Sequence, residues 1–388
     1  MTKKNIIIVT GHSKLDSGGV GTHLRLLIDA MHKTEFFISV VMGGGYICKL
    51  YNLFNKFSDK FLGLHKSFES LSPLINILFL EKKLEKTINK IGENKEFIVH
   101  CHDRSSTIAA YRLKSKYKIK IVQTVHAPFS LQYEIHPLIS KSLTPLYIRG
   151  LDEKSCKFAD HYIAVDELQK RLLLNSYGGE IDSNKITIIH NAVEQSLLEM
   201  VENKRHDYFV VARHLHEKNG VEYAIRAFAH LKKQKDGLVK LKIIGFGPLE
   251  KDLRSLTVEL GVMDSVEFLG AQPRKKCIEL ISSAIGSIVP SIPVGDYIEA
   301  TSLTMLESMA LKTPLIASNI GGIKEVLDGK GAAFLVEPKD YFKISDAMIK
   351  IIERDPVVSV KTSVAYDIIK DFYTVDKWVK KIVNAYAR

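Results

Sequence analysis

The sequence lacks the features of a membrane-spanning or disulfide-stabilised protein. No apolar run reaches the ~18 residues that a membrane helix needs, and the run Ile6 to Val9 is too short for the core of a signal peptide. The cysteines show no C-x-x-C spacing, so neither a zinc site nor a disulfide framework is expected. We therefore expect a cytoplasmic protein whose thiols are reduced and structural. These thiols belong to Cys48, Cys101, Cys156 and Cys277.

Several motifs that define other nucleotide-binding and nucleic-acid-binding proteins are also absent. The glycine-rich loop over residues 10–21 has neither G-x-G-x-x-G spacing nor a G-K-[ST] phosphate loop, which argues against a dehydrogenase or a nucleotide-driven motor. No Lys and Arg cluster interleaved with aromatic residues appears, so nucleic acid is the least favoured partner. The formal charge of +11 favours an anionic partner, such as a phosphate-bearing small molecule or an acidic membrane surface.

The length of the chain and its strand pattern indicate two domains. A chain of 388 residues is longer than one hydrophobic core usually grows. Short β-branched runs alternate with helix-like segments in each half, which is typical of parallel α/β sheets. We predict two doubly wound domains, 1–197 and 198–372, joined by a polar linker over 192–207. The predicted strands are 5–9, 36–42, 97–101, 119–125, 161–165 and 186–190, then 208–212, 241–244, 266–269, 286–289, 314–317 and 333–336.

Two loops that follow predicted strands carry residues suited to phosphate. Gly18, Gly19 and Gly21 precede the helix predicted over 22–31, where free backbone N–H groups can meet a phosphate, although a flexible connection explains them equally well. Arg213 and Lys218 follow the strand 208–212 and could bind a diphosphate. The guanidinium of Arg213 would make two parallel hydrogen bonds, and the ammonium of Lys218 would act as a point charge. Taken alone, this second pair is better interpreted as solvated surface charge.

The strongest local pattern is a pair of glutamates in residues 298–310. Glu299 precedes a predicted helix that Thr301 or Ser302 can cap, so the positive end of the helix dipole would face the ligand cleft. Glu307 lies eight positions later among apolar residues, where an acid is costly without a hydrogen-bonding partner such as a ribose hydroxyl. The pattern predicts a binding site at the start of this helix.

These motifs in combination resemble glycosyltransferase family 4, whose mark is E-x7-E. Glu299 and Glu307 match that spacing, and residues 312–326 resemble the family's G-T-P-V-V-A-S-x-x-G-G-x-x-E-V stretch. Further matching parts fall in the family's order and span nearly the whole chain. They are the Gly18 to Gly21 loop, 100–103, 124–126, 188–193, Arg213 with Lys218, and 244–249.

The resemblance implies a GT-B fold, in which two Rossmann-like domains face a central cleft. Domain 1–197 would bind the acceptor and domain 198–372 the nucleotide sugar. The C-terminal segment has apolar residues at helical spacing over 375–386. The resemblance returns this helix, 373–388, to the first domain.

Site residues follow from the same resemblance. Arg213 and Lys218 would neutralise the diphosphate leaving group, Glu299 would contact the donor sugar and Glu307 the ribose. Backbone N–H groups of Thr301, Ser302 and Leu303 would hold the phosphates, with Gly19 and Gly21 in the loop near them. His126 matches the family's histidine next to the donor sugar, although without that context a lone histidine is more often structural. The remaining histidines of this region, His12, His23, His100 and His102, are expected to be structural.

The resemblance also implies a mechanism and leaves several points open. It implies retention of anomeric configuration, and because the sequence has no D-x-D motif we expect no metal and no cofactor. The family's Gly-Phe-Gly is replaced by Ala300-Thr301-Ser302, which leaves the donor sugar open. UDP-sugars are favoured over GDP-mannose by analogy alone. The expected acceptor is a glycan or lipid-linked glycan in cell-envelope or polysaccharide synthesis.

A basic segment raises the question of membrane contact. Phe and Leu residues recur at helical spacing over 46–68 with lysines between them, so this segment could lie on an anionic membrane or pack onto the first sheet. Three other functions stay in view: a sugar-nucleotide epimerase, a non-catalytic nucleotide-sugar-binding scaffold, and a peripheral membrane adaptor. An epimerase would need no acceptor, and an adaptor would not need Glu299.

Overall fold

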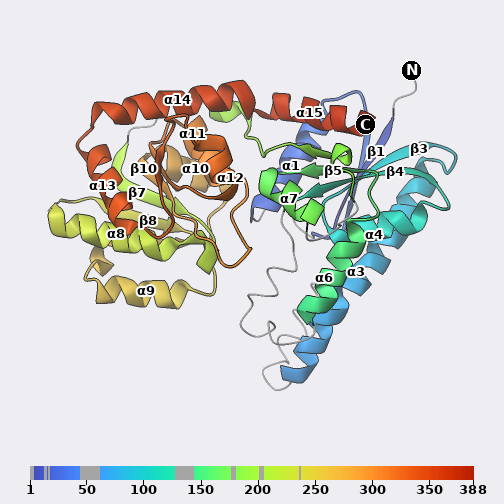
Figure 1. Cartoon of the computed structure of the whole chain (residues 1–388), viewed down its shortest axis with the longest axis horizontal. Helices are drawn as coiled ribbons and strands as arrows, with labels where there is room; N and C mark the ends of the chain where they lie inside the picture. The colour runs from blue at the N-terminus through green and yellow to red at the C-terminus, as the bar shows by residue number, and fades with distance from the viewer. Residues whose placement is uncertain are drawn as a thin grey trace. The chain divides into compact units, whose positions relative to one another are not determined.

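The computed structural model describes residues 4–12, 15, 18–43, 62–126, 144–175, 181–200, 205–235 and 237–388. The chain divides into two compact units (Figure 1). Unit 1 comprises Met1–His190 and Val379–Arg388, and unit 2 comprises Asn191–Trp378. Each unit has its own parallel sheet and its own core, and each is described by itself.

The sheet of unit 1 is a doubly wound parallel sheet. Its strand order is β2-β1-β3-β4-β5-β6, and every neighbouring pair is parallel. The order reverses between β1 and β3, which lie side by side. The strands are β1 (Asn5–Thr10), β2 (Phe37–Met42), β3 (Glu96–Cys101), β4 (Lys118–Val125), β5 (His161–Ala164) and β6 (Ile186–Ile188).

Successive side chains along the strands of unit 1 point to opposite faces of the sheet. Val99 and Cys101 of β3 join the core that packs beneath α3, α4, α6 and α7. His100, one position along, points to the other face, where Tyr386 of α15 contacts it. The helices are α1 (Gly18–Met31), α3 (Leu62–Ile91), α4 (Arg104–Leu113), α6 (Thr144–Ser155) and α7 (Glu167–Asn175).

Asp103 ties the ends of β1 and β3 together in unit 1. It caps α4, accepting at Oδ1 from the N–H of Ser106 at 2.9 Å. Its Oδ2 accepts from the N–H of Gly11 at 2.5 Å and from the Thr10 hydroxyl at 3.2 Å. One carboxylate thus fixes the loop after β1 against the start of α4, at the edge of the sheet where parallel strands place their ligands.

The sheet of unit 2 has the strand order β12-β11-β10-β7-β8-β9 and is also parallel throughout. Here the order reverses between β7 and β10. The strands are β7 (His206–Ala212), β8 (Lys240–Ile244), β9 (Val266–Gly270), β10 (Ala284–Val289), β11 (Leu315–Ser318) and β12 (Phe334–Val336).

Successive side chains of β7 point alternately to the two layers of helices in unit 2. Tyr208 and Val210 join the core under α10, α11, α12 and α14, whereas Phe209 and Val211 join the core under α8, α9 and α13. Figure 1 shows α8 and α9 on one side of this sheet and α11 and α14 on the other. The helices are α8 (Val221–Gln234), α9 (Glu250–Glu259), α10 (Arg274–Ser282), α11 (Leu303–Ala310), α12 (Gly321–Leu327), α13 (Tyr341–Ile352) and α14 (Pro356–Phe372).

The chain passes from unit 2 back to unit 1 through one helix. Helix α15 (Val375–Ala387) contributes its first residues, up to Trp378, to unit 2 and the rest to unit 1. The short 3-10 turns are η1 (Ser183–Lys185), η2 (Gln195–Leu197), η3 (Glu217–Asn219) and η4 (Met263–Ser265).

The predicted strands and the two-sheet fold class are confirmed, and every predicted strand appears with bounds within about two residues. The predicted linker 192–207 is too long, because β7 already begins at His206. Most of the segment 46–68 lies outside the described residues, and its last part opens α3. Cys101, Cys156 and Cys277 are free thiols, as expected, and Cys48 lies outside the described residues.

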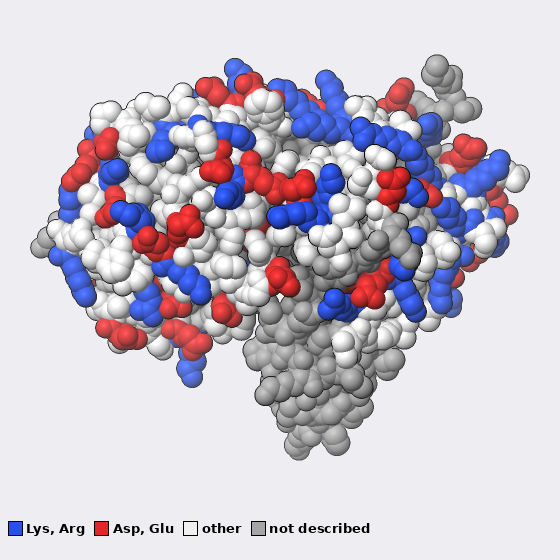
Figure 2. Space-filling view, viewed as in Figure 1, with Lys and Arg blue, Asp and Glu red and all other residues white. Residues whose placement is uncertain are grey.

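Two surface properties bear on possible partners. Among the described residues, none of the helices combines the length and the hydropathy needed to cross a membrane. Figure 2 shows basic and acidic side chains interspersed over much of the described part of one face. The positive charge therefore does not by itself identify a partner.

Candidate active site

Residues at the reversal point of the unit 2 sheet form a compact charged cluster. Ligands of open parallel sheets bind outside the carboxyl ends of the strands, where the strand order reverses. Arg213 directly follows β7, and Ser291 and Glu299 lie on the chain between β10 and α11. Because β7 and β10 are neighbours in the sheet, the loops after them meet at this point. Three residues predicted from the sequence, Arg213, Lys218 and Glu299, are brought together here.

The cluster is a carboxylate held by two cations. Glu299 Oε2 lies 2.8 Å from Arg213 Nη2 and 2.9 Å from Lys218 Nζ. The side chains of Arg213, Lys218 and Glu299 are only 9%, 20% and 10% exposed. The interpretation of Arg213 and Lys218 as solvated surface charges is therefore wrong.

All three groups of this cluster are charged at neutral pH. Burial raises the pKa of Glu299, but the charges of Arg213 and Lys218 outweigh burial and hold that pKa at about 2. Burial lowers the pKa of Lys218, but Glu299 and Tyr297 raise it by more. Lys218 Nζ also lies 4.6 Å from the centre of the Tyr297 ring. Two cations and one anion leave the cluster with a net charge of one positive unit.

Neighbouring oxygens fix the guanidinium of Arg213. Its Nη1 donates to Ser302 Oγ at 3.0 Å, and its Nη2 donates to Asn219 Oδ1 at 2.5 Å and to Ser291 Oγ at 3.2 Å. Asn219 is held in turn, because its amide donates to the carbonyl of His214 at 2.7 Å. Asn219 and Ser291 were missed by the sequence reasoning, and the position of Asn219 next to Lys218 was the only available signal.

The start of α11 lies against the same cluster. Ser302 caps α11, accepting from the N–H of Met305 at 3.4 Å, which confirms one of the two predicted caps. The other, Thr301, offers its carbonyl to the amide of Asn191 at 2.9 Å. Leu303 is the first residue of the helix. The N–H groups at a helix start have no partner within the helix, so this end suits a phosphate.

A pair of glycines lets the loop before α11 pack closely against α12. A Cβ added at Gly322 would lie 2.4 Å from the backbone N of Thr301, and one added at Gly321 would lie 2.1 Å from the carbonyl oxygen of Glu299. Gly321 also has a φ of +49°, which disfavours other residues. These glycines therefore hold the loop that carries Glu299 in place.

Glu307, predicted to meet a ribose, faces an arginine that the sequence did not point to. Its carboxylate forms an ion pair with Arg274 Nη1, and Arg274 Nε lies 3.7 Å from Glu194 Oε1. Burial lowers the pKa of Arg274, but Glu307 raises it by more. The contact of Glu307 with a ribose stays a prediction.

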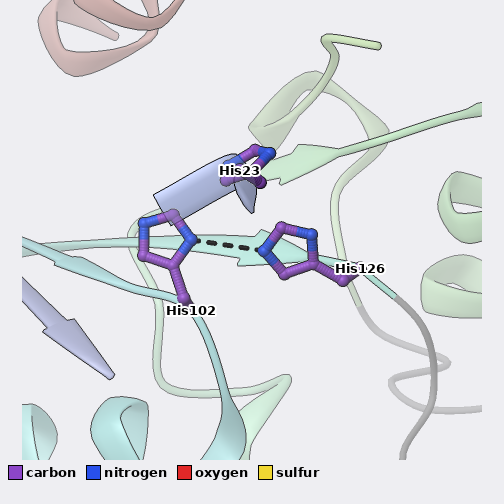
Figure 3. A group of neighbouring side chains, drawn as sticks. All are labelled: His23, His102 and His126. Atoms are coloured by element: carbon purple, nitrogen blue, oxygen red, sulfur yellow. Dashed lines mark hydrogen bonds between the residues drawn. The ribbon is translucent and has the colours of Figure 1, made fainter. Parts of the chain in front are cut away.

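The remaining predicted residues belong to unit 1. His126 follows β4, and its Nε2 lies 3.3 Å from Nδ1 of His102, which follows β3; His23 of α1 lies beside both (Figure 3). Gly19 and Gly21 lie in the first turn of α1. A Cβ at Gly21 would lie 3.0 Å from the carbonyl oxygen of Leu15, so this glycine serves close packing. The predicted site residues are thus divided between the two units.

The histidines of unit 1 differ in how their nitrogens are satisfied. His100 Nδ1 lies 2.7 Å from the Tyr386 hydroxyl and its Nε2 lies 2.7 Å from the Thr124 hydroxyl. Burial and the neighbouring His23 lower the pKa of His100 to about 3, so it is a neutral structural histidine, as expected. Burial first, and then nearby histidines, lower the pKa of His102 and of His126 well below their usual range.

A separate pocket in unit 2 is not this site. It lies at the amino-terminal ends of β7 and β8, where His206 and Lys240 begin the strands, and it is also lined by Lys276 and Glu279. Parallel sheets bind their ligands at the opposite ends of the strands, so the charged cluster after β7 and β10 is the better candidate.

Comparisons with known proteins agree with the fold. A model of glycosyltransferase family 4 matches residues 17–197, and a model of the glycosyl transferases group 1 matches residues 199–374. An uncharacterised glycosyltransferase of Methanocaldococcus jannaschii is 24% identical over 329 residues, which are 80% of each chain. The O-antigen chain mannosyltransferase of Salmonella typhimurium is 30% identical over 212 residues, 54% of this chain and 56% of the relative.

Solved structures show the same architecture. Sucrose-phosphate synthase of Thermosynechococcus elongatus superposes with a TM-score of 0.76 at 15% identity, over 99% of this chain and 98% of that one. Anabaena HepE in complex with UDP superposes with a TM-score of 0.71 at 16% identity, over 99% of both chains. The two sheets, together with these family and structural matches, thus define a glycosyltransferase of the GT-B fold. Within that class, the chain belongs to glycosyltransferase family 4, of the group 1 type.

Proposed function

We propose that this glycosyltransferase moves a hexose from a nucleoside diphosphate donor to a glycan or lipid-linked acceptor in cell-envelope or polysaccharide synthesis. UDP-sugars are the favoured donors, because HepE has been solved with UDP and with UDP-glucose. GDP-mannose is second, in line with the mannosyltransferase among the relatives. Other relatives are named for colanic acid and amylovoran biosynthesis, which supports a polysaccharide product.

The proposal rests mainly on the Arg213, Lys218 and Glu299 cluster. When the donor's bond between C1 and the phosphate oxygen breaks, negative charge builds on the β-phosphate. A cluster with a net positive charge at the carboxyl ends of β7 and β10, beside the start of α11, can stabilise that charge. We therefore assign Arg213 and Lys218 to the diphosphate, and Glu299 to holding both cations and orienting the donor sugar.

The same cluster supports transfer without a catalytic metal, and the family resemblance supports transfer with retention. The fixed cations supply the charge stabilisation that a metal supplies in other enzymes. In this mechanism the acceptor hydroxyl attacks C1 from the face that the phosphate leaves. The departing phosphate oxygen takes the hydroxyl proton, and the new C1–O bond replaces the broken one.

The proposal is tested with a panel of nucleotide sugars in the presence of EDTA. Binding is measured by thermal shift, and each donor that binds is then followed for nucleoside diphosphate release with and without a lipid extract. We expect a stabilising donor whose cleavage is faster with lipid. A sugar that is altered but not transferred would indicate an epimerase, and the lack of stabilisation by any donor would indicate a scaffold.

Substitutions separate the cluster from ordinary surface charge. Arg213→Ala and Glu299→Ala should each lower turnover by about 100-fold or more, because a preorganised charge contact is lost at the leaving group. Arg254→Ala is the matched control, since Arg254 is 52% exposed on α9, where it pairs with Glu250 and lies over the Phe268 ring, away from the cluster. Near-normal turnover in either cluster variant, with the fold intact, would overturn the proposed site.

A further inference from the structure

Three histidines of unit 1 gather at the carboxyl ends of β3 and β4. His102 and His126 directly follow these strands, and His23 reaches them from α1 (Figure 3). One ring nitrogen from each of the three lies within 4.8 Å of the other two. His23 and His102 are 3% and 4% exposed, and His126 is half-buried.

The spacing of the nitrogens is that of ligands on one metal ion. His102 Nδ1 and His126 Nε2 lie 3.3 Å apart. Two nitrogens bound to one tetrahedral Zn²⁺ at ~2.0–2.1 Å each also lie ~3.3 Å apart. A ring nitrogen of His23 lies within 4.8 Å of both and is the third candidate ligand. A tetrahedral ion would then keep one position for water.

One nitrogen of the cluster lacks a hydrogen-bond partner among the described residues. A hydrogen bond between His102 and His126 satisfies one nitrogen of each ring, but His102 Nε2 stays buried without a hydrogen-bond partner among the described residues. His100, beside it, has an oxygen partner for both of its nitrogens. Buried polar groups are normally satisfied, so His102 is less completely hydrogen-bonded by the protein than His100 is.

We propose that His23, His102 and His126 form a binding site for a divalent transition metal of the Zn²⁺ class. Three imidazoles are a ligand set that Zn²⁺ and its neighbours favour, whereas Mg²⁺ and Ca²⁺ prefer oxygen. A metal of this class binds the neutral form of an imidazole. The sequence gives no signal for this site, because the three histidines are distant in sequence and show no metal-binding spacing.

The metal site would regulate transfer and is not required for it. His126 is the residue that we expect beside the donor sugar, and a bound ion would engage its Nε2. Zn²⁺ should therefore slow transfer, and EDTA should restore it. This consequence, unlike the binding itself, rests on the proposed function.

Binding is tested on the full chain, stripped of metal with EDTA and titrated with Co²⁺ and then Zn²⁺. We expect one equivalent of Co²⁺ with the visible absorption of a tetrahedral ion, displaced by Zn²⁺. Zn²⁺ should also raise the melting temperature reversibly. His126→Gln and His23→Gln should weaken binding by about 100-fold or more, as expected for losing a ligand. His126 is half-buried, so its variant should fold, and circular dichroism checks this.

His32→Gln is the matched control, because His32 is an exposed histidine just after α1. It should bind Co²⁺ like the wild type. Wild-type binding without a tetrahedral spectrum, or unchanged binding in both cluster variants, would overturn the proposal. If Co²⁺ binds as expected but Zn²⁺ leaves transfer unaffected, the metal site stands and the placement of His126 at the donor sugar is wrong.

Discussion

At the scale of single residues, Glu299 keeps its charge in a buried position because two cations face it. Its pKa is about 2 in the folded protein, compared with 4.5 for an ordinary glutamate. Between these values the unfolded chain takes up a proton that the folded chain does not. The stabilisation from Glu299 is therefore complete above pH 4.5 and is lost as the pH falls to about 2.

Glu299→Gln should remove this pH dependence. We expect the variant to be less stable than the wild type at neutral pH, by roughly 3 kcal/mol, because Arg213 and Lys218 lose their counter-charge. The difference should shrink as the pH falls from 4.5 to 2. Urea unfolding at a series of pH values measures this difference in stability. Glu250→Gln is the control, because Glu250 forms a surface ion pair with Arg254. A constant difference across this pH range would contradict the assigned charge state.

At the scale of elements, the strands were predictable and the site was predictable in part. Short β-branched runs that alternate with helix-like segments form few structures other than a parallel sheet. Both sheets could therefore be predicted from the sequence. The position of Arg213 at a strand exit and of Glu299 just before a helix also predicted that they would be near the ligand edge. Which side chains face each other depends on helix directions that spacing does not give. For this reason the sequence did not predict Ser291 as a partner of Arg213 or Arg274 as a partner of Glu307. It also did not predict the histidine cluster of unit 1.

The packing of α12 against the loop before α11 can be tested with one methyl group. Gly322→Ala places a Cβ 2.4 Å from the backbone N of Thr301, so the loop or the helix must shift. We expect a loss of about 1–3 kcal/mol in stability, typical of overpacking. Nucleoside diphosphate binding should also weaken, because the shifted loop contacts the ligand less well. A loss of about 1.4 kcal/mol in binding free energy would raise the Kd roughly tenfold. Thermal melts with and without UDP measure both effects.

The control for this change is Gly237→Ala, where an added Cβ meets nothing within 4 Å. It should match the wild type in both stability and binding. If Gly322→Ala lowered stability but left nucleotide affinity unchanged, the loop with Glu299 and Thr301 would not contribute to donor binding.

At the scale of the whole molecule, the two units have separate cores and share helix α15. Its last part belongs to unit 1, where the Tyr386 hydroxyl lies 2.7 Å from His100 Nδ1 and the Tyr386 carbonyl accepts from Lys120 Nζ at 3.0 Å. Ile382 and Tyr386 are 1% and 3% exposed, so the end of the chain is part of the unit 1 core. Stability in unit 1 should therefore depend on contacts that unit 2 does not share.

Tyr386→Phe tests this independence. The change leaves His100 Nδ1 buried without its partner, which should cost about 1–3 kcal/mol within unit 1. Hydrogen exchange of β3 and β4 should become faster, while exchange of β7 and β10 stays unchanged, because local stability follows the core in which a contact lies. Tyr366→Phe is the reciprocal control, since the Tyr366 hydroxyl donates to the Leu198 carbonyl at 3.2 Å within unit 2. If both variants accelerated exchange equally in both sheets, the units would unfold as one cooperative body, and the shared helix would couple them.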